Sequence, residues 1–268
     1  TNLSFARRAG LHRAANPLNL TASVALVVDT ASGEVLYARN EHAILPIASL
    51  TKLLTAIVLL DAKVPLSQSI RITRDDVDTL RHSRSRLRVG TTLTRREALR
   101  LALMSSENRA AHALARTFPG GTDAFVAAMN RKAAELGMAH STFVDPTGLS
   151  NRNRATGLDV ATLVAAAAEY PTLRRYSTTK RRQVSFGKRR LQYLNSNRLV
   201  RHTDWPFVVQ KTGYIVEAGQ CVAMATRTGG RTVTLVVMDA GSVTTRSQDL
   251  RKMRKWATRE VAQGTAGR

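Results

Sequence analysis

The sequence is poor in several residue types, and each scarcity excludes a class of protein or site. Its single cysteine, Cys221, excludes an intramolecular disulfide and any metal cluster built from cysteines. Aromatic residues make up only 5% of the 268 residues, and no aromatic-rich strand or zinc-finger spacing occurs among the basic residues. This disfavours a specific nucleic-acid-binding module. No apolar run reaches the roughly 18 residues that span a bilayer, so no transmembrane helix is expected.

Acidic residues are scarce as well. The 19 Asp+Glu face 41 Lys+Arg, which gives a net charge of +22, and 33 of the basic residues are Arg while only 8 are Lys. A pI near 11.5 favours a polyanionic partner, because basic side chains neutralise phosphates and carboxylates. The basic residues are nevertheless spread along the chain, most densely over 81–88, 174–190 and 251–259. A solvated basic surface and attraction to a polyanion therefore both stay open.

The hydrophobic pattern is that of a folded protein with strands near both ends and helices between them. Hydrophobic residues make up 43% of the chain and charged residues 22%, close to the average of globular domains. Alternation and turn residues distinguish strands from segments with helical spacing. The expected strands are 23–28, 34–37, a pair within 182–194, 221–228 and 232–238, and the expected helices are 50–60, 94–104, 123–136, 159–170 and 244–262.

This order predicts an α+β fold. One antiparallel sheet is expected from the N- and C-terminal strands, flanked by the terminal helices, with a helical lobe at about 62–175 inserted between them. Residues 1–20 are expected to be a flexible lead-in, 21–264 a single domain and 265–268 a tail. Thr94 followed by Glu97 predicts a capping box at the start of a helix.

Most catalytic signatures are missing, but one serine–lysine pair has a favourable setting. There is no His-Glu-x-x-His, no Gly-x-Ser-x-Gly and no phosphate loop, and the six histidines show no ligand spacing, so no metal or cofactor is predicted. Ser49-Leu50-Thr51-Lys52 begins an apolar helix, where residues three apart share a face and Lys52 can reach the Ser49 hydroxyl. A desolvated lysine loses proton affinity and can serve as the base that a serine nucleophile needs.

Two further Ser-x-x-Lys matches weaken the motif taken alone. Ser177–Lys180 and Ser185–Lys188 fall in expected strand or turn, where no such alignment follows. The order of two other motifs separates the three candidates. Ser106-Glu107-Asn108 follows the helix 94–104, and Lys211-Thr212-Gly213 lies where a strand would precede the hairpin 221–238. Only Ser49 precedes both motifs.

This ordered triple resembles the active-site serine family of β-lactamases and penicillin-binding proteins. Beyond the motifs, Pro46–Leu53, Leu103–Asn108, Phe143–Leu149, Lys211–Tyr214 and Glu217–Gly219 are similar to the low-molecular-mass penicillin-binding proteins of the D-alanyl-D-alanine carboxypeptidase and endopeptidase branch. The resemblance covers about residues 22–262 and implies a β-lactamase/transpeptidase-like fold. The Glu-x-x-Leu-Asn segment of class A β-lactamases is absent from 143–160, which disfavours a β-lactamase.

The resemblance implies a role for each motif residue. Ser49 would be the acylated nucleophile and Lys52 its base. Ser106 would relay a proton to the leaving amine, while Asn108 holds Lys52 and the substrate amide. Substrate binding would fall to Lys211, Thr212, Gly213 and Tyr214, with the backbone N–H groups of Ser49 and Tyr214 as the oxyanion hole.

The expected function is a serine D,D-peptidase that hydrolyses peptide cross-links in peptidoglycan and is inhibited by β-lactams. The chain ends about one helix after the last strand, similar to the endopeptidase type represented by penicillin-binding protein 7. A carboxypeptidase or weak β-lactamase is the alternative, and a basic polyanion-binding module with a vestigial site is the alternative from another class. A periplasmic chain, processed or trimmed at Thr1, is expected, with no specific nucleic-acid partner, a charge suited to an anionic cell wall, and other cell-wall hydrolases as possible partners.

Overall fold

The computed structural model describes residues 3–266, and their side chains up to residue 262. Its centre is a five-stranded antiparallel sheet in the order β2-β1-β11-β10-β9. These strands are β1 (Val24–Asp29), β2 (Val35–Arg39), β9 (Phe207–Ile215), β10 (Gly219–Thr228) and β11 (Arg231–Ala240). The sheet thus joins both ends of the chain through the pairing of β1 with β11, as the sequence predicts.

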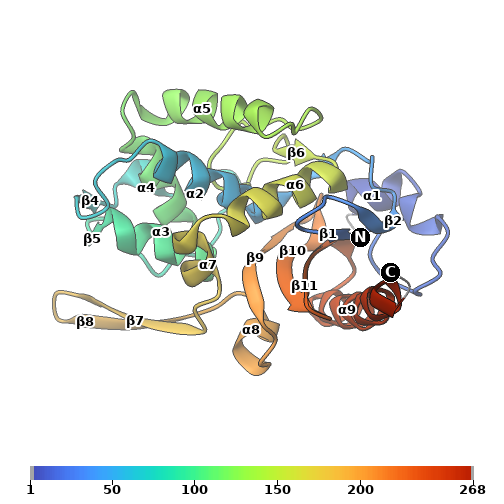
Figure 1. Ribbon diagram of the computed structural model, residues 1–268. Helices are drawn as coiled ribbons and strands as arrows, with labels where there is room; N and C mark the ends of the chain where they lie inside the picture. The colour runs from blue at the N-terminus through green and yellow to red at the C-terminus, as the bar shows by residue number, and fades with distance from the viewer. Residues whose placement is uncertain (1–2, 267–268) are drawn as a thin grey trace.

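Helices cover both faces of this sheet (Figure 1). The C-terminal helix α9 (Val243–Ala266) packs on one face, where Met253 and Ala257 join an apolar cluster with Val222 and Leu235. On the other face lies α6 (Gly157–Ala168), and α2 (Thr51–Asp61) packs against α6 from the helical lobe, within the larger core cluster. The apolar stripes of these helices and the buried residues of both sheet faces therefore stabilise one another by excluding water.

The helical lobe stands to the left of the sheet in Figure 1. Besides α2 it contains α3 (Arg95–Met104), α4 (Asn108–Arg116), α5 (Gly121–Glu135) and α7 (Pro171–Ser177). The stretch 62–175 also carries elements that the pattern did not predict, namely β4 (Ser69–Arg71) paired with β5 (Thr92–Thr94), β6 (Arg154–Ala155) paired with β3 (Leu45–Pro46), and the 3-10 turn η3 (Arg74–Asp76). That 21–264 is an independent domain stays a prediction.

Two hairpins match the turn signals of the sequence. Gly229 and Gly230 connect β10 to β11 with φ angles of 55° and 80°, the left-handed pair that a two-residue primed turn requires. The second hairpin, β7 (Arg181–Phe186) with β8 (Arg189–Leu194), turns at Gly187 and projects beneath the helical lobe (Figure 1). After β8 comes the short helix α8 (Arg198–His202).

The expected flexible lead-in over residues 1–20 is wrong for its described part. Residues 4–14 form α1 (Phe5–Arg8) and the turn η1 (Leu11–Arg13), and Ser4 and Ala6 are buried. The N–H of Phe5 donates to Glu217 O at 2.9 Å, and the buried Arg39 guanidinium donates to the carbonyls of His12 and Ala14. Hydrogen bonds to residues far away in the chain, which leave no periodicity in the sequence, anchor this segment.

Two smaller expectations also need correction. Thr94 caps α3 by accepting a hydrogen bond from Glu97 N, but Glu97 does not complete a capping box, because its carboxylate pairs with Arg100 and Arg182 instead. The helix expected over 244–262 runs from Val243 to Ala266. It includes the first two residues of the expected tail 265–268, and the last two lie outside the described residues.

Candidate active site

Ser49 lies at the junction of the sheet and the helical lobe. It occupies the 3-10 turn η2 (Ala48–Leu50) that leads directly into α2, rather than the first turn of the α-helix itself. Ile47, Ala48 and Leu50 are fully buried and hold this turn, while the Ser49 side chain is half-buried. The predicted alignment is present, since Lys52 Nζ donates to Ser49 Oγ at 2.7 Å.

The Lys52 side chain is buried beside Ser49, with 1% of its surface exposed. Besides the bond to Ser49, its Nζ donates to Asn108 Oδ1 at 2.7 Å and to the backbone oxygen of Thr147 at 2.8 Å. Burial lowers the pKa of Lys52 to about 7, although the negative charges of Asp145 and Glu107 oppose this shift. At neutral pH a large fraction of this amine is therefore uncharged.

The loop that carries Thr147 is shaped by Asp145. The Oδ1 atom of Asp145 accepts hydrogen bonds from the N–H groups of Thr147 and Gly148, at 2.6 and 2.8 Å. Gly148 has a φ of +84°, and a Cβ built on it would lie 1.9 Å from the carbonyl oxygen of Ala48. Only glycine therefore lets the loop come close enough for Thr147 O to reach Lys52. Our sequence reasoning missed both contributions, for which the turn residues Asp145–Gly148 were the available signal.

The Ser106–Asn108 motif joins the end of α3 to the start of α4. Ser106 sits in the left-handed region with φ of 59°, a conformation that costs a residue with a Cβ on the order of 1 kcal/mol. Asn108 directs its two amide atoms to different partners, with Oδ1 on Lys52 and Nδ2 donating to Ser83 Oγ at 3.0 Å. Between them Glu107 is buried, which raises the pKa of its carboxyl, and it accepts a hydrogen bond from Ser85 Oγ at 2.5 Å.

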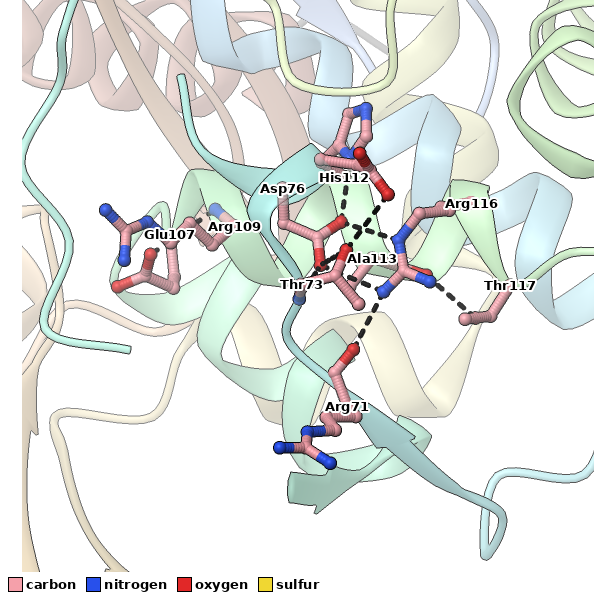
Figure 2. A network of polar contacts seen from close by, with 10 residues as sticks. Arg71, Thr73, Asp76, Glu107, Arg109, His112, Ala113, Arg116 and Thr117 are labelled. Atoms are coloured by element: carbon pink, nitrogen blue, oxygen red, sulfur yellow. Dashed lines mark hydrogen bonds and ion pairs between the residues drawn. The ribbon is translucent and has the colours of Figure 1, made fainter. Parts of the chain in front are cut away.

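A polar network fixes the helix that begins at Asn108 (Figure 2). Asp76 accepts hydrogen bonds from Arg116 Nε and Nη2 at 3.0 and 2.9 Å, and its Oδ1 lies 2.8 Å from His112 Nδ1. Burial opposes the ionisation of Asp76, but these bonds and one from Thr73 N outweigh it and lower its pKa to about 2. The ionised Asp76 thus ties α4 to the segment 71–76.

The Lys211–Tyr214 segment runs along the edge strand β9. Lys211 is fully buried and donates to the oxygen of Thr212 at 2.8 Å, and its pKa is far below the usual value because of burial and the charges of Lys52 and Arg246. A Cβ on Gly213 would lie 3.0 Å from Ser49 N, so glycine allows the strand to lie against the serine turn. The Tyr214 side chain is 56% exposed.

Ser196 joins the two sides of the site, and no motif or spacing signalled it. Its N–H donates to Met104 O at 2.7 Å, just before the turn that carries Ser106. Its hydroxyl lies 2.6 Å from the hydroxyl of Thr212. Through Ser196 the end of α3 and the strand β9 are held in one arrangement.

The structure thus brings all three motifs together around Ser49, and a comparison with known families shows which family shares them. The model of the D-alanyl-D-alanine carboxypeptidase family, peptidase family S11, matches residues 11–242. The chain belongs to this family. It is therefore a serine D,D-peptidase, as the ordered motifs predict.

Individual relatives of this carboxypeptidase family agree. The D-alanyl-D-alanine endopeptidase of Pseudomonas aeruginosa is 44% identical over 92% of this chain and 80% of its own length. The D-alanyl-D-alanine endopeptidase of Escherichia coli is 38% identical over 94% of this chain and 82% of its own length. The crystal structure of the Streptomyces K15 DD-transpeptidase superposes with a TM-score of 0.82 at 25% identity, covering 89% of this chain and 97% of that one. The predicted fold class is confirmed.

The structure also places the remaining residues that the sequence singled out. Lys180 pairs with Asp204 at 3.3 Å, and Ser177 ends helix α7 rather than lying in strand or turn as expected. Cys221 is buried in β10, and burial raises the pKa of its thiol to about 12. Within residues 3–266 no group of His, Cys, Asp and Glu side chains is placed to hold a metal ion, and no helix there has the length and apolar character needed to cross a bilayer.

Proposed function

We propose that this chain hydrolyses D-alanyl peptide cross-links in peptidoglycan through an acyl-enzyme on Ser49. The endopeptidase assignment is supported by the two relatives of that name, each matched over more than nine-tenths of this chain. The family places the chain among bacterial cell-wall peptidases, and a periplasmic location, with other cell-wall hydrolases as partners, is part of the proposal.

The observation that carries the proposal is the environment of the Lys52 amine. A charged lysine has three N–H donors, and Ser49 Oγ, Asn108 Oδ1 and Thr147 O accept one each. With a pKa of about 7 the amine readily loses one proton. The two remaining N–H groups keep the bonds to Asn108 and Thr147, and the lone pair faces the Ser49 hydroxyl. The neutral amine is thereby aimed at the proton it must take.

The acylation step then follows from this arrangement. Ser49 Oγ forms a bond to the carbonyl carbon of the D-alanyl residue, and Lys52 takes the hydroxyl proton. The C–N bond breaks, and the leaving amine receives a proton that Ser106 relays from Lys52. A serine kept in a left-handed conformation that glycine would adopt without strain supports a role for its hydroxyl. Water subsequently hydrolyses the ester and frees Ser49.

An oxyanion hole from the N–H groups of Ser49 and Tyr214 fits the strand geometry. Backbone groups alternate in direction along an antiparallel strand. The Ile215 carbonyl is directed into the turn toward β10, where it accepts from Ala218 N at 3.1 Å, so the neighbouring N–H of Tyr214 faces the open edge of β9. The approach of Gly213 to Ser49 N brings the two N–H groups to one side of the substrate carbonyl.

Lys211 and Thr212 complete the proposed site as the binders of a substrate carboxylate. Removing Lys211 from water makes its charge costly, so an anion at its amine is strongly favoured. A β-lactam, which presents both an acylating carbonyl and a carboxylate, is expected to acylate Ser49 and to be released slowly.

Digestion of purified cross-linked muropeptide dimers tests the proposal. Conversion of dimers to monomers by the wild-type chain, and none by Ser49→Ala, is the expected result. Loss of a terminal D-alanine with intact dimers would assign a carboxypeptidase instead. Penicillin hydrolysis with many turnovers would assign a weak β-lactamase, and salt-sensitive polyanion binding without penicillin labelling would indicate a vestigial site.

A further inference from the structure

One of the three densest basic stretches of the sequence forms a strap over one wall of the proposed site. We define the strap as residues 81–88. Its side chains alternate in exposure like those of an edge strand. Arg81, Ser83, Ser85 and Leu87 are buried or half-buried, and His82, Arg84, Arg86 and Arg88 are exposed. One face of the strap is therefore turned inward, and the outward face carries three arginines.

The inward face contacts the Ser106–Asn108 motif directly. Ser83 Oγ accepts a hydrogen bond from Asn108 Nδ2 at 3.0 Å, and Ser85 Oγ donates to the buried Glu107 carboxylate at 2.5 Å. The strap therefore runs along Glu107 and Asn108, and Asn108 accepts a hydrogen bond from Lys52. Its outward face is the opposite side of this same segment.

Both ends of the strap are tied to other parts of the molecule. The Arg81 guanidinium donates to Leu149 O and pairs with Glu217 at 2.9 Å, in the turn between β9 and β10. At the other end, Arg86 Nη1 donates to Gln192 O at 2.5 Å on β8. The strap thus spans from the end of β9 to the projecting β7–β8 hairpin and presents a fixed surface.

The outward arginines are not neutralised by the protein. Among the described residues, no acidic side chain forms an ion pair with Arg84, Arg86 or Arg88. Beside them, between residues 88–92 and the hairpin tip, is a hollow of about 490 Å³ lined by Arg88, Arg189, Phe186, Gly187 and residues 89–92. Its described lining holds two arginines, apolar surface from Phe186 and Val89, and no carboxylate.

We propose that the strap and this hollow bind the carboxylates of the second peptide in a cross-linked substrate. The proposal rests on the proposed endopeptidase function and specifies the substrate as an anionic peptide longer than the scissile dipeptide. Arginine forks match carboxylates, and Phe186 with Val89 offers an apolar surface for the side chain that bears one. Binding there is expected to act mainly on KM and to weaken as salt screens the charges.

The test compares two cross-linked dimers that differ only in charge, one with free carboxylates and one with the same carboxylates amidated. Arg84→Gln/Arg88→Gln removes two outward charges on exposed side chains, and neither side chain forms a hydrogen bond or ion pair with the described catalytic residues. The matched control is Lys255→Gln/Arg259→Gln, two exposed residues of α9 on the other side of the sheet. Acylation by a fluorescent penicillin reports on the integrity of Ser49 in every variant.

We expect the strap variant to raise KM for the free-carboxylate dimer by about fivefold at low salt. Its kcat for that dimer, its KM for the amidated dimer and its rate of acylation by penicillin should each change less than about twofold. The control variant should match the wild type. An equal rise in KM in the strap and control variants would show that only the net charge matters, and this would overturn the proposal. An unchanged KM in the strap variant would overturn it as well. If the wild type cleaves neither dimer, the proposed function itself fails, which is a different result from cleavage without discrimination.

Discussion

Two serine–lysine pairs with the same spacing have opposite surroundings in this molecule. Ser49 precedes helix α2, so Lys52 lies in its first turn, 1% exposed and bonded to three acceptors. Ser177 is the last residue of α7, so Lys180 falls beyond the helix, where its side chain is 56% exposed and pairs with Asp204. The spacing alone therefore does not single out a candidate base. Burial and three converging hydrogen-bond acceptors distinguish Lys52 from Lys180.

The serines differ as well. Ser49 is half-buried, and its Oγ is hydrogen-bonded to the Lys52 amine. Ser177 is buried, and its Oγ accepts a hydrogen bond from Gln210 N at 3.2 Å. The second serine serves the packing of α7 against β9, and the first is available for chemistry. Four experiments test this difference between the two serine–lysine pairs and its cause, the burial of Lys52.

Replacing the two serines should give the largest difference. Ser49→Ala is expected to abolish covalent penicillin labelling, a loss of at least about 10³-fold. Among the described residues no other hydroxyl is hydrogen-bonded to a buried lysine amine. Ser177→Ala should keep full labelling and lower only thermal stability. Fluorescent penicillin followed by denaturing electrophoresis measures the first, and a melting curve the second. Label on the Ser49→Ala chain would refute the assignment.

Replacing the two lysines should give the next largest difference, in the rate of acylation by penicillin. Lys52→Met removes the proposed base and is expected to slow acylation by about 10²- to 10⁴-fold, the usual worth of a positioned general base. Lys180→Met should change the rate less than about twofold, because its exposed ion pair is remote from Ser49. The second-order rate constant of acylation measures both, and comparable losses would show that the contrast in burial is irrelevant.

The pH dependence of acylation should follow Lys52. Only the neutral amine can accept the Ser49 proton, so the rate should fall about tenfold per pH unit below its pKa of about 7 and level off above it. Stopped-flow acylation between pH 5 and 9 measures this limb. An ordinary lysine would place it far more alkaline, and such a profile would contradict the role of burial.

The smallest effect is expected from Glu107. Its negative charge raises the pKa of Lys52, so Glu107→Gln should lower that pKa and move the acidic limb to lower pH. Glu97→Gln, which removes a carboxylate engaged with Arg100 and Arg182, serves as the control with an unmoved limb. A limb that stays in place in Glu107→Gln would mean that this carboxylate does not influence the base.

The sequence was sufficient for features set by local rules. The contact between Ser49 and Lys52 follows from spacing within one helical start, and the β10–β11 hairpin follows from Gly229-Gly230. The motif order also predicted the family, because each motif needs its own structural setting.

Features that depend on distant partners escaped prediction. Thr147 O reaches Lys52 only because Gly148 lets its loop lie against Ala48, and Ser196 acts through residues far away in the chain. The anchoring of residues 4–14 depends on Arg39, whose burial no local pattern indicates. In each case the determining contact joins residues far apart in the chain, and no local pattern in a single sequence indicates such a contact.

The account's central claim is that burial lowers the pKa of Lys52 to about 7, so that a substantial fraction of the amine is uncharged near neutrality. Direct titration tests this claim most closely. With only 8 lysines, NMR of lysine labelled with carbon-13 at the ε position gives few signals, and Lys52→Arg and Lys211→Arg assign the two buried ones. We expect the Lys52 signal to titrate with a pKa of about 7. Titration at the ordinary lysine value of about 10.4 would contradict the account.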